Sequence, residues 1–305
     1  MKRTLKTLAA AMLLMPGIAC AQSRFIILND AGINGYKNHK TVAEVMGRMA
    51  AEQKVKFVIG AGDQLHMQGA MTVDDPIWIT NFEMIYTNPS LLWIPWYEIA
   101  GNHEYNGNVD ALIEYSNVSR RWTMPARYYS FTEDDPESGA KIRFIMLDTT
   151  PMQHNPKKDD HSDARLQDVR AQLKWIEETL DRPCDADWTI LVGHHPVYAN
   201  TSKTANQQKQ LREHLLPILE KHPEIDYYIC GHIHTFEHIV KERMKTEFIV
   251  NASAGTGRAV VEGEENPLFS YGDSGFMIAT FDKATLAFDL IDKEGKTLYS
   301  TSKKK

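Results

Sequence analysis

Short apolar runs alternate with amphipathic stretches along most of the chain. Apolar residues recur at helical spacing over 42–50, around 211–219 and, most regularly, over 166–180. Each of these stretches is therefore predicted to form a helix with one face packed on a core. Short runs rich in β-branched and aromatic residues predict strands, at 25–28, 57–59, 96–99, 144–147, 189–192, 227–230, 248–250, 276–281 and 286–291.

The order of these elements indicates the fold class. Buried strands that alternate with helices are typical of a layered α/β (α+β) fold. The strand-rich end indicates a sheet that becomes antiparallel, or a second sheet packed on the first. No tandem repeat or low-complexity linker interrupts the chain, so one domain with a well-buried core is expected over residues 22–305.

Polar residues follow the predicted strands at five places, and in four of them a glycine comes directly before the polar residue. Glycine lets the chain turn sharply and lets the backbone approach a site closely. Because ligands of open α/β sheets bind at the carboxyl ends of the strands, these side chains are expected to converge on one crevice. The residues concerned are Asp30, Asp63, Asn102 with His103, His194, and His232 with His234.

Each of these groups has an ordinary alternative when taken alone. Asp30 could cap a helix or occupy a turn, Gly62-Asp63 is a common turn pair, and the His194 segment could be a structural loop. The sharpest local pattern is Gly101-Asn102-His103-Glu104, in which an amide oxygen can bind a hard metal and the next histidine can protonate a leaving group. Together the carboxylate, amide and imidazole groups suit iron, manganese and zinc, and they predict a centre with two metal ions.

The residues in these motifs resemble those of the calcineurin-like metallophosphoesterases. The resemblance is to the small mammalian-type purple acid phosphatases, and it covers nearly the whole chain after residue 21. It implies a two-layer β-sandwich flanked by helices, with the metals at the strand ends along one edge. It also implies hydrolysis of phosphomonoesters by attack of a metal-bound hydroxide on phosphorus. Stretches that match beyond the motifs are 94–97, 120–122, 144–149, 172–175 and 275–276.

The resemblance further implies which side chains bind each metal. The first metal would be bound by Asp30, His66 and His234. The second would be bound by Asn102, His194 and His232. Asp63 would bridge the two metals, and His103 would be the acid at the leaving group, close to the substrate together with Asn102. Iron is expected at one site, and iron, manganese or zinc at the other.

This sequence departs from the family pattern at three places. His66 stands where the family has a tyrosine that binds ferric iron and makes the protein purple; the alternative is that His66 does not touch a metal. Asn29 stands where the family commonly has glycine. Lys203 replaces a further active-site histidine, whose role is then either vacant or taken by a residue of the polar loop 151–164, namely His154 or His161.

The first 21 residues have the pattern of an export signal. Three basic residues precede an apolar run over 8–19, and small residues at Ala19 and Ala21 form a cleavage site before Gln22. That run is too short to cross a bilayer as a helix, which takes about 20 residues. We therefore expect a periplasmic or secreted protein. A buried core helix is one alternative, and a lipid anchor at Cys20 is another, although Gly17 stands where such signals usually have leucine.

The composition is that of an ordinary globular protein, with 43% hydrophobic and 24% charged residues. Loss of the predicted signal would remove three positive charges and change the net charge from −6 to −9. An acidic chain is not expected to bind nucleic acid, whereas a small phosphate ester remains a suitable substrate because bound cations dominate the local field. Cys184 and Cys230 leave open whether a disulfide forms, and the sequence does not indicate the oligomeric state.

Two other functions fit the same residues. The metal core would equally serve a phosphodiesterase or nucleotide hydrolase, because the pocket walls decide between monoesters and diesters. A non-catalytic, exported metal-binding protein is the other alternative. The presence of both His103 and Asn102 argues against it, since a storage site has no need of an acid beside its metals.

Overall fold

The computed structural model describes residues 22–153, 163–201 and 205–305. The predicted export signal with Cys20, the two loop histidines His154 and His161, and Lys203 lie outside the described residues. Among the described residues no helix is both long and apolar enough to span a membrane. Cys184 is exposed, Cys230 is buried, and both are free thiols.

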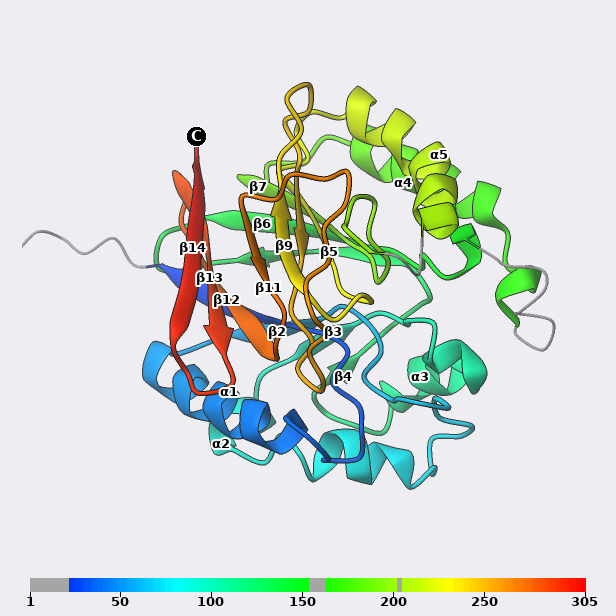
Figure 1. The fold of residues 1–305 in the computed structure, drawn as a ribbon, viewed down its shortest axis with the longest axis vertical. Coiled ribbons are helices and arrows are strands. Elements are labelled where there is room, and N and C mark those ends of the chain that lie inside the picture. The colour runs from blue at the N-terminus through cyan, green and yellow to red at the C-terminus, as the bar shows by residue number, and fades with distance from the viewer. Residues whose placement is uncertain (1–21, 154–162, 202–204) are drawn as a thin grey trace, which may run out of the picture.

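Two seven-stranded sheets lie face to face, as the two-layer prediction required (Figure 1). In spatial order, the first sheet contains β14 (Thr297–Lys304), β13 (Thr285–Asp292), β12 (Gly275–Phe281), β1 (Ser23–Leu28), β2 (Phe57–Gly60), β3 (Trp96–Glu98) and β4 (Trp122–Thr123). The second contains β11 (Phe269–Tyr271), β9 (Phe236–Ile239), β10 (Glu247–Val250), β8 (Tyr227–Cys230), β7 (Trp188–Val192), β6 (Lys141–Met146) and β5 (Tyr129–Asp134).

Both sheets combine parallel and antiparallel strands. In the first sheet β1 to β4 run parallel, and β12 to β14 continue it with antiparallel pairs. In the second sheet β6, β7, β8 and β10 run parallel, while β5, β9 and β11 pair antiparallel at its flanks. The predicted change to antiparallel pairing and the predicted second sheet are therefore both present.

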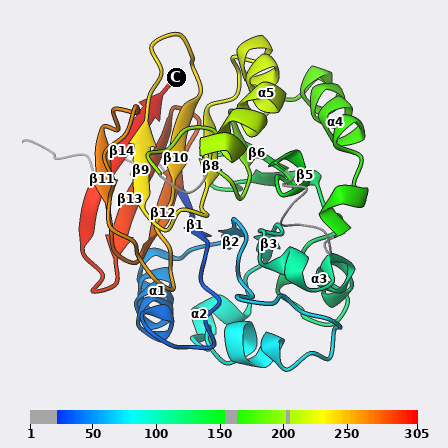
Figure 2. The ribbon, with the colours of Figure 1, turned by 45° about the vertical axis from the view of Figure 1, so that its right-hand side comes forward.

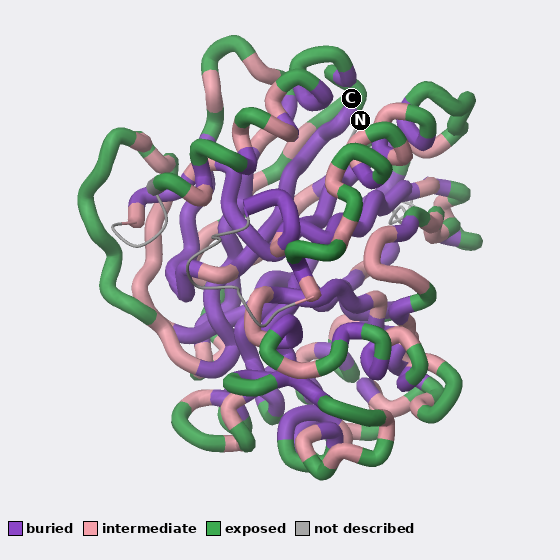
Figure 3. The backbone as a smooth tube through the Cα atoms, turned by 90° about the vertical axis from the view of Figure 1, so that its right-hand side faces the viewer, coloured by how far each residue is buried: buried purple, intermediate pink, exposed green. Residues whose placement is uncertain are grey.

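The main core fills the space between the sheets (Figure 3). Phe25 of β1 meets Phe144 of β6 across this space, with ring centroids 5.4 Å apart and the rings perpendicular. Such edge-to-face contacts between buried aromatic rings add to the free energy gained by burial. The strands that supply the core are apolar on both faces, which is why the sequence shows them as continuous apolar runs.

Helices cover the outer faces of the two sheets (Figure 2). The first sheet is flanked by α1 (His39–Gln53) and α2 (Pro89–Leu92). A second apolar cluster joins α4 (Val169–Asp181) and α5 (Ala205–Lys221) to the second sheet. The remaining helix, α3 (Val109–Tyr115), and four short helical segments at Ile79–Glu83, Glu104–Asn106, Pro151–Gln153 and Asp163–Leu166 complete the described helices.

One predicted helix begins later than expected. The apolar pattern placed its start at 166, but α4 begins at Val169 because the side chain of Asp168 accepts a hydrogen bond from the backbone N–H of Ala171 and caps the helix. Leu166 belongs to a separate 3₁₀ turn and is 75% exposed. Its place in the periodic pattern was a coincidence of spacing.

Candidate metal centre

Loops that follow five strands meet at one edge of the two sheets, and they carry all the predicted ligand residues. They leave the carboxyl ends of β1, β2 and β3 in the first sheet and of β7 and β8 in the second. Four of these residues have left-handed backbone conformations, with φ between 49° and 74°, which residues other than glycine rarely adopt. Such conformations cluster at functional sites, where the surrounding structure holds them. The four residues are Asp30, Asp63, His232 and His234.

The first cluster contains the three residues predicted for the first metal. The ligand atoms of Asp30, His66 and His234 all lie within 4.8 Å of one another. The Nε2 of His234 is 3.1 Å from the Oδ1 of Asp30. The Nδ1 of His234 faces the carbonyl oxygen of Thr256 at 2.7 Å, so Nδ1 carries the hydrogen and Nε2 is the nitrogen free to bind a cation.

Asp63 lies between the first cluster and a second cluster that contains His194. Its Oδ2 is 3.3 Å from the Nε2 of His66 and 3.1 Å from the Nε2 of His194. The Nδ1 of His194 faces the carbonyl oxygen of Ala61 at 2.8 Å, which again leaves Nε2 for a ligand. One carboxylate thus contacts a predicted ligand of each metal, which is the position that a bridging ligand needs.

The second cluster contains His194 and His232, and Asn102 is the remaining predicted ligand of the second metal. The rings of His194 and His232 lie 5.2 Å apart. The Oδ1 of Asn102 is buried and accepts no hydrogen bond from the described residues. A buried amide oxygen without a donor is costly unless a cation fills its place, so the residues present fit a pair of divalent or trivalent metal ions.

The carboxylates and imidazoles of the centre shift one another's pKa. Burial alone would raise the pKa of Asp63, but His194 and His66 outweigh burial and hold it well below its ordinary value. Burial alone would lower the pKa of His194, but Asp63 raises it to about 10. A cation that binds here must displace these protons, because imidazole binds metals only in its neutral form.

His103 lies beside the shared carboxylate and is partly exposed. Its backbone N–H donates to the Oδ1 of Asp63 at 2.9 Å, and its Nε2 is 4.0 Å from Oδ2. Its Nδ1 faces the carbonyl oxygen of Met67 at 3.0 Å, so Nδ1 carries the fixed hydrogen. The second proton of the imidazolium therefore sits on Nε2, from which it can be transferred, and burial lowers the pKa of the ring.

Glu104 holds two of the ligand loops together, and sequence reasoning gave it no role of its own. Its buried carboxylate accepts three backbone hydrogen bonds, from Asp63 at 2.9 Å, Leu65 at 2.8 Å and Gly101 at 2.7 Å. The loops also touch directly, because a Cβ on Gly101 would lie 2.2 Å from the Oδ1 of Asp63. The only trace in the sequence is an acidic residue directly after His103.

Asn29 orients Asp30, which accounts for the departure from the family's glycine. The Nδ2 of Asn29 donates to the Oδ2 of Asp30 at 2.7 Å, and the Oδ1 of Asn29 accepts from Asn251 at 2.6 Å. The backbone N–H of His232 donates to the same Oδ2 at 2.7 Å. Only Oδ1 of Asp30 is left to face the first cluster.

His195, the residue after His194, is a buried part of the second cluster and was not predicted from the sequence. The Oγ1 of Thr149 accepts from the backbone N–H groups of both histidines at 3.1 Å. With both lone pairs used, Thr149 donates its own hydrogen to the Nδ1 of His195 at 2.9 Å. The Nε2 of His195 therefore carries a hydrogen and is a donor rather than a metal ligand.

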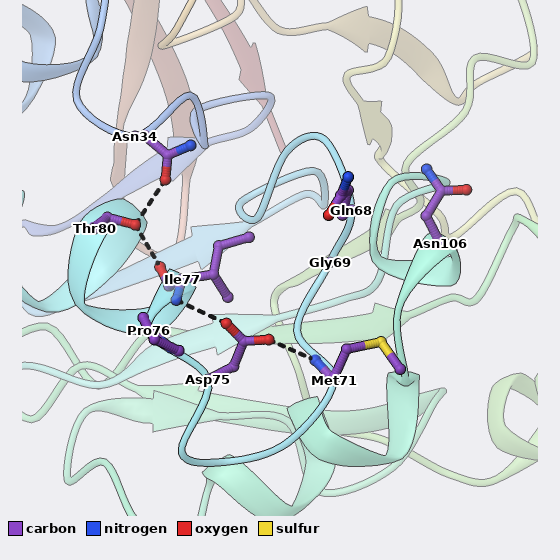
Figure 4. A pocket seen from close by; sticks show the side chains of 9 residues that line it. All are labelled: Asn34, Gln68, Gly69, Met71, Asp75, Pro76, Ile77, Thr80 and Asn106. Carbon is purple, nitrogen blue, oxygen red and sulfur yellow. Dashed lines mark hydrogen bonds between the residues drawn. The ribbon is translucent and has the colours of Figure 1, made fainter.

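Two cavities lie near the centre. One, of about 460 Å³, is lined by His66, His103 and His234 together with residues of two neighbouring loops. The other, of about 550 Å³, contains none of the predicted ligands (Figure 4). It is bordered by Asn34 and Thr80 on one side and by Gln68 and Asn106 on the other. Asp75, the one carboxylate among the described residues that line it, accepts hydrogen bonds from backbone N–H groups.

The chain is similar in sequence to known proteins. Residues 23–236 match the family model described as calcineurin-like phosphoesterase. The chain is 30% identical over 290 residues to purple acid phosphatase 4 of Arabidopsis thaliana, covering 90% of this chain and 81% of that one. It is 29% identical over 319 residues to human tartrate-resistant acid phosphatase type 5, covering 95% and 94%.

Solved structures share the fold. One is described as GAP50, the anchor in the inner membrane complex of Plasmodium, with a TM-score of 0.76, 24% identity, and coverage of 93% of this chain and 89% of that one. A dimetal phosphatase from Danio rerio has a TM-score of 0.62 at 13% identity, covering 92% and 98%. At these identities the likeness concerns the fold alone.

Proposed function

Because the chain belongs to the calcineurin-like phosphoesterase family and is a phosphoester hydrolase with a dinuclear metal centre, we propose that it is an exported phosphatase that acts on phosphomonoesters. The observation that carries the proposal is the position of Asp63, whose carboxylate contacts His66 on one side and His194 on the other. The relatives named acid phosphatases support monoesters as the substrate class. They also argue against a non-catalytic metal-binding protein.

We assign the histidine and carboxylate ligands from the clusters, and Asn102 from its buried amide oxygen without a donor. The first metal would be held by Asp30, His66 and His234, and the second by Asn102, His194 and His232, with Asp63 shared. Iron at one position and iron, manganese or zinc at the other suit these oxygen and nitrogen donors. When bound, the two cations would neutralise the charge of the phosphate group and lower the pKa of water at the centre.

His103 is the residue we assign to protonate the leaving group. The carbonyl of Met67 fixes the hydrogen on Nδ1, so the transferable proton lies on Nε2. The hydrogen bond from the backbone of His103 to Asp63 fixes the acid relative to the shared carboxylate. The clamp formed by Glu104 holds the two loops that carry these residues, which keeps the geometry in place before the substrate binds.

Export is a separate part of the proposal and rests on the sequence alone. The basic start, the apolar run over 8–19 and the small residues at Ala19 and Ala21 favour a mature chain that begins at Gln22 outside the cytoplasm. N-terminal analysis of the protein from its native host tests this. An intact Met1 in the cytoplasm would contradict it, and a lipidated Cys20 would place the protein at a membrane surface instead.

Activity and metal content should be measured on one sample. We expect protein with two bound metal ions to release phosphate from a monoester faster than it releases nitrophenol from a nitrophenyl diester. Faster diester cleavage would make the protein a phosphodiesterase. A sample that holds two metals and cleaves neither ester would contradict the proposed function.

A further inference from the structure

The cavity of about 460 Å³ is joined to the centre through three histidines, and one of them is the proposed acid. His103 must lie against the oxygen that departs from phosphorus, because it gives its proton to that oxygen. His66 and His234, which we assign to the first metal, form the adjacent wall. The part of the substrate that leaves therefore extends from His103 into this cavity.

The outer wall of the cavity is apolar and open to solvent. It includes Ile33, Tyr36 and Met67, which come from the loop before α1 and from the residue after His66. Tyr36 is 73% exposed and Met67 is 66% exposed, although both are large apolar side chains. Exposed apolar groups beside a polar site mark a surface that a ligand covers, and a ring and a thioether suit the face of an aromatic group.

Two cations, Lys37 and Arg258, also line the cavity, and none of the described residues that line it is a carboxylate. Neither side chain forms an ion pair or hydrogen bond with any residue that the structure describes. The backbone N–H of Arg258 donates to the carbonyl oxygen of His234 at 2.9 Å, which fixes its segment relative to the first cluster. Free cations at the mouth of a cavity, in a chain of net charge −6, favour a ligand with a negative group.

The other cavity does not have these properties. Its polar lining consists of amides, a hydroxyl and the engaged carboxylate of Asp75, and none of the described residues that line it is a cation (Figure 4). None of the predicted catalytic or ligand residues lines it. A negatively charged leaving group would therefore meet no opposite charge from these lining residues. We assign the selection of the substrate to the smaller cavity.

We propose that Ile33, Tyr36, Met67, Lys37 and Arg258 form a leaving-group subsite for aryl phosphomonoesters that carry a second negative group on the ring. The aromatic body of the leaving group lies against Tyr36 and Met67, and the negative group lies against Lys37 and Arg258. This inference rests on the proposed phosphatase function and names its substrate class.

Binding and turnover should be measured separately on the metal-loaded protein. Calorimetry with methylphosphonate, phenylphosphonate and 4-carboxyphenylphosphonate measures binding without any reaction. We expect the affinity of the wild-type protein to rise in that order. The Tyr36→Ala, Met67→Ala double variant lacks both apolar side chains, and it should bind phenylphosphonate about tenfold more weakly. Methylphosphonate binding should change less than about twofold, because a methyl group does not reach the wall. Trp93→Ala, which removes an exposed aromatic ring outside the cavity, is the matched control.

The cations are tested with Lys37→Gln and Arg258→Gln. Each should reduce the advantage of the carboxyphenyl ligand over the phenyl ligand, whereas Arg243→Gln, at an exposed position outside the cavity lining, should not. Equal effects of the wall variants on all three phosphonates would overturn the subsite, and so would the absence of any preference in the wild-type protein. If the preferences are present but phenyl phosphate and 4-carboxyphenyl phosphate are not hydrolysed, the subsite stands and the phosphatase function fails.

Discussion

The Nε2 of His66 lies 3.3 Å from the Oδ2 of Asp63, the carboxylate that we place between the two metals. By the resemblance to the purple acid phosphatases, His66 stands where that branch has the tyrosine that gives it its colour. An imidazole has no anionic oxygen that could donate charge to ferric iron. We therefore expect an iron-loaded sample to lack an intense visible band, and the neutral ligand to favour a divalent pair of metals.

The variant His66→Tyr tests whether position 66 reaches a metal. Loaded with ferric iron, it should turn pink or purple, and its absorption spectrum should show a band that the wild-type protein lacks. Trp93→Tyr is a suitable control, because Trp93 is 72% exposed and does not line the cavity beside the centre. A colourless His66→Tyr variant with two metals bound would show that the residue does not bind metal.

Asp63→Asn should lose metal and nearly all activity. The substitution keeps the size of the side chain but removes the negative charge that faces both His66 and His194. Metal analysis after extensive dialysis, with activity measured on the same sample, checks both effects. Asp74→Asn, at an exposed position, should retain both metals and full activity. Two tightly held metals in the Asp63 variant would rule out a bridging role.

His103→Ala should retain both metals and lose turnover. General-acid catalysis is worth about 10²–10⁴-fold, and the loss should be largest for alkyl phosphates, whose leaving groups are strong bases. Nitrophenyl phosphate should be affected much less, because nitrophenolate departs without a proton. The ratio of wild-type to variant kcat for the two substrates is the measurement. Equal losses for both would argue against the acid role.

The apolar strands were predictable from the sequence, and several peripheral strands were not. Strands such as β1 and β8 are buried on both faces, so their sequences are almost wholly apolar. The edge strand β14 is polar and largely exposed, and β9 carries Glu237 and His238 in buried positions. Pairing with neighbouring strands, rather than any local pattern, makes β4, β5, β9, β11 and β14 extend the sheets.

The candidate site likewise contains residues that could be predicted from the sequence and residues that could not. Most predicted ligands could be found because they follow strands that the pattern reveals, whereas His66 was identified only through the family resemblance. The structure brings the loops that carry these residues to one edge of the sheets. Their roles as ligands remain predictions. Glu104 and Thr149 could not be assigned from spacing, because they act on backbone N–H groups of loops about 40 residues away in the chain. A side chain that binds distant backbone leaves no periodic pattern.

Glu104→Ala should destabilise the metal-free protein strongly. It would leave three buried N–H groups without an acceptor, at a cost of about 1–3 kcal/mol for each. Thermal or urea unfolding of the metal-free variant measures the loss, which should reach at least about 3 kcal/mol in the free energy of unfolding. Glu114→Ala, at an exposed position of α3, should change stability little. An equally small effect at Glu104 would mean that the clamp is not needed to hold the loops.

The contribution of the buried Asp148 to stability should fall as pH rises from about 4 to 7. Burial raises the pKa of this carboxyl from 3.8 to about 7, although the hydroxyl of Tyr105 and the charge of Arg127 act in the opposite direction. In this interval the unfolded chain has released the proton while the folded chain still holds it. Ionisation therefore favours unfolding, and the stability present below pH 4 is lost progressively up to pH 7.

The Asp148→Asn variant isolates this contribution. A shift of roughly three pKa units corresponds to a change on the order of 4 kcal/mol, so the wild-type protein should lose about that much relative to the variant between pH 4 and 7. Urea unfolding of both proteins at matched pH values measures the difference, in which the contributions of groups that do not interact with Asp148 cancel. Tyr105→Phe should move the interval to higher pH, because it removes the donor that stabilises the ionised carboxylate. Parallel pH profiles for the wild-type protein and Asp148→Asn would show that Asp148 is ionised in the folded chain throughout this range.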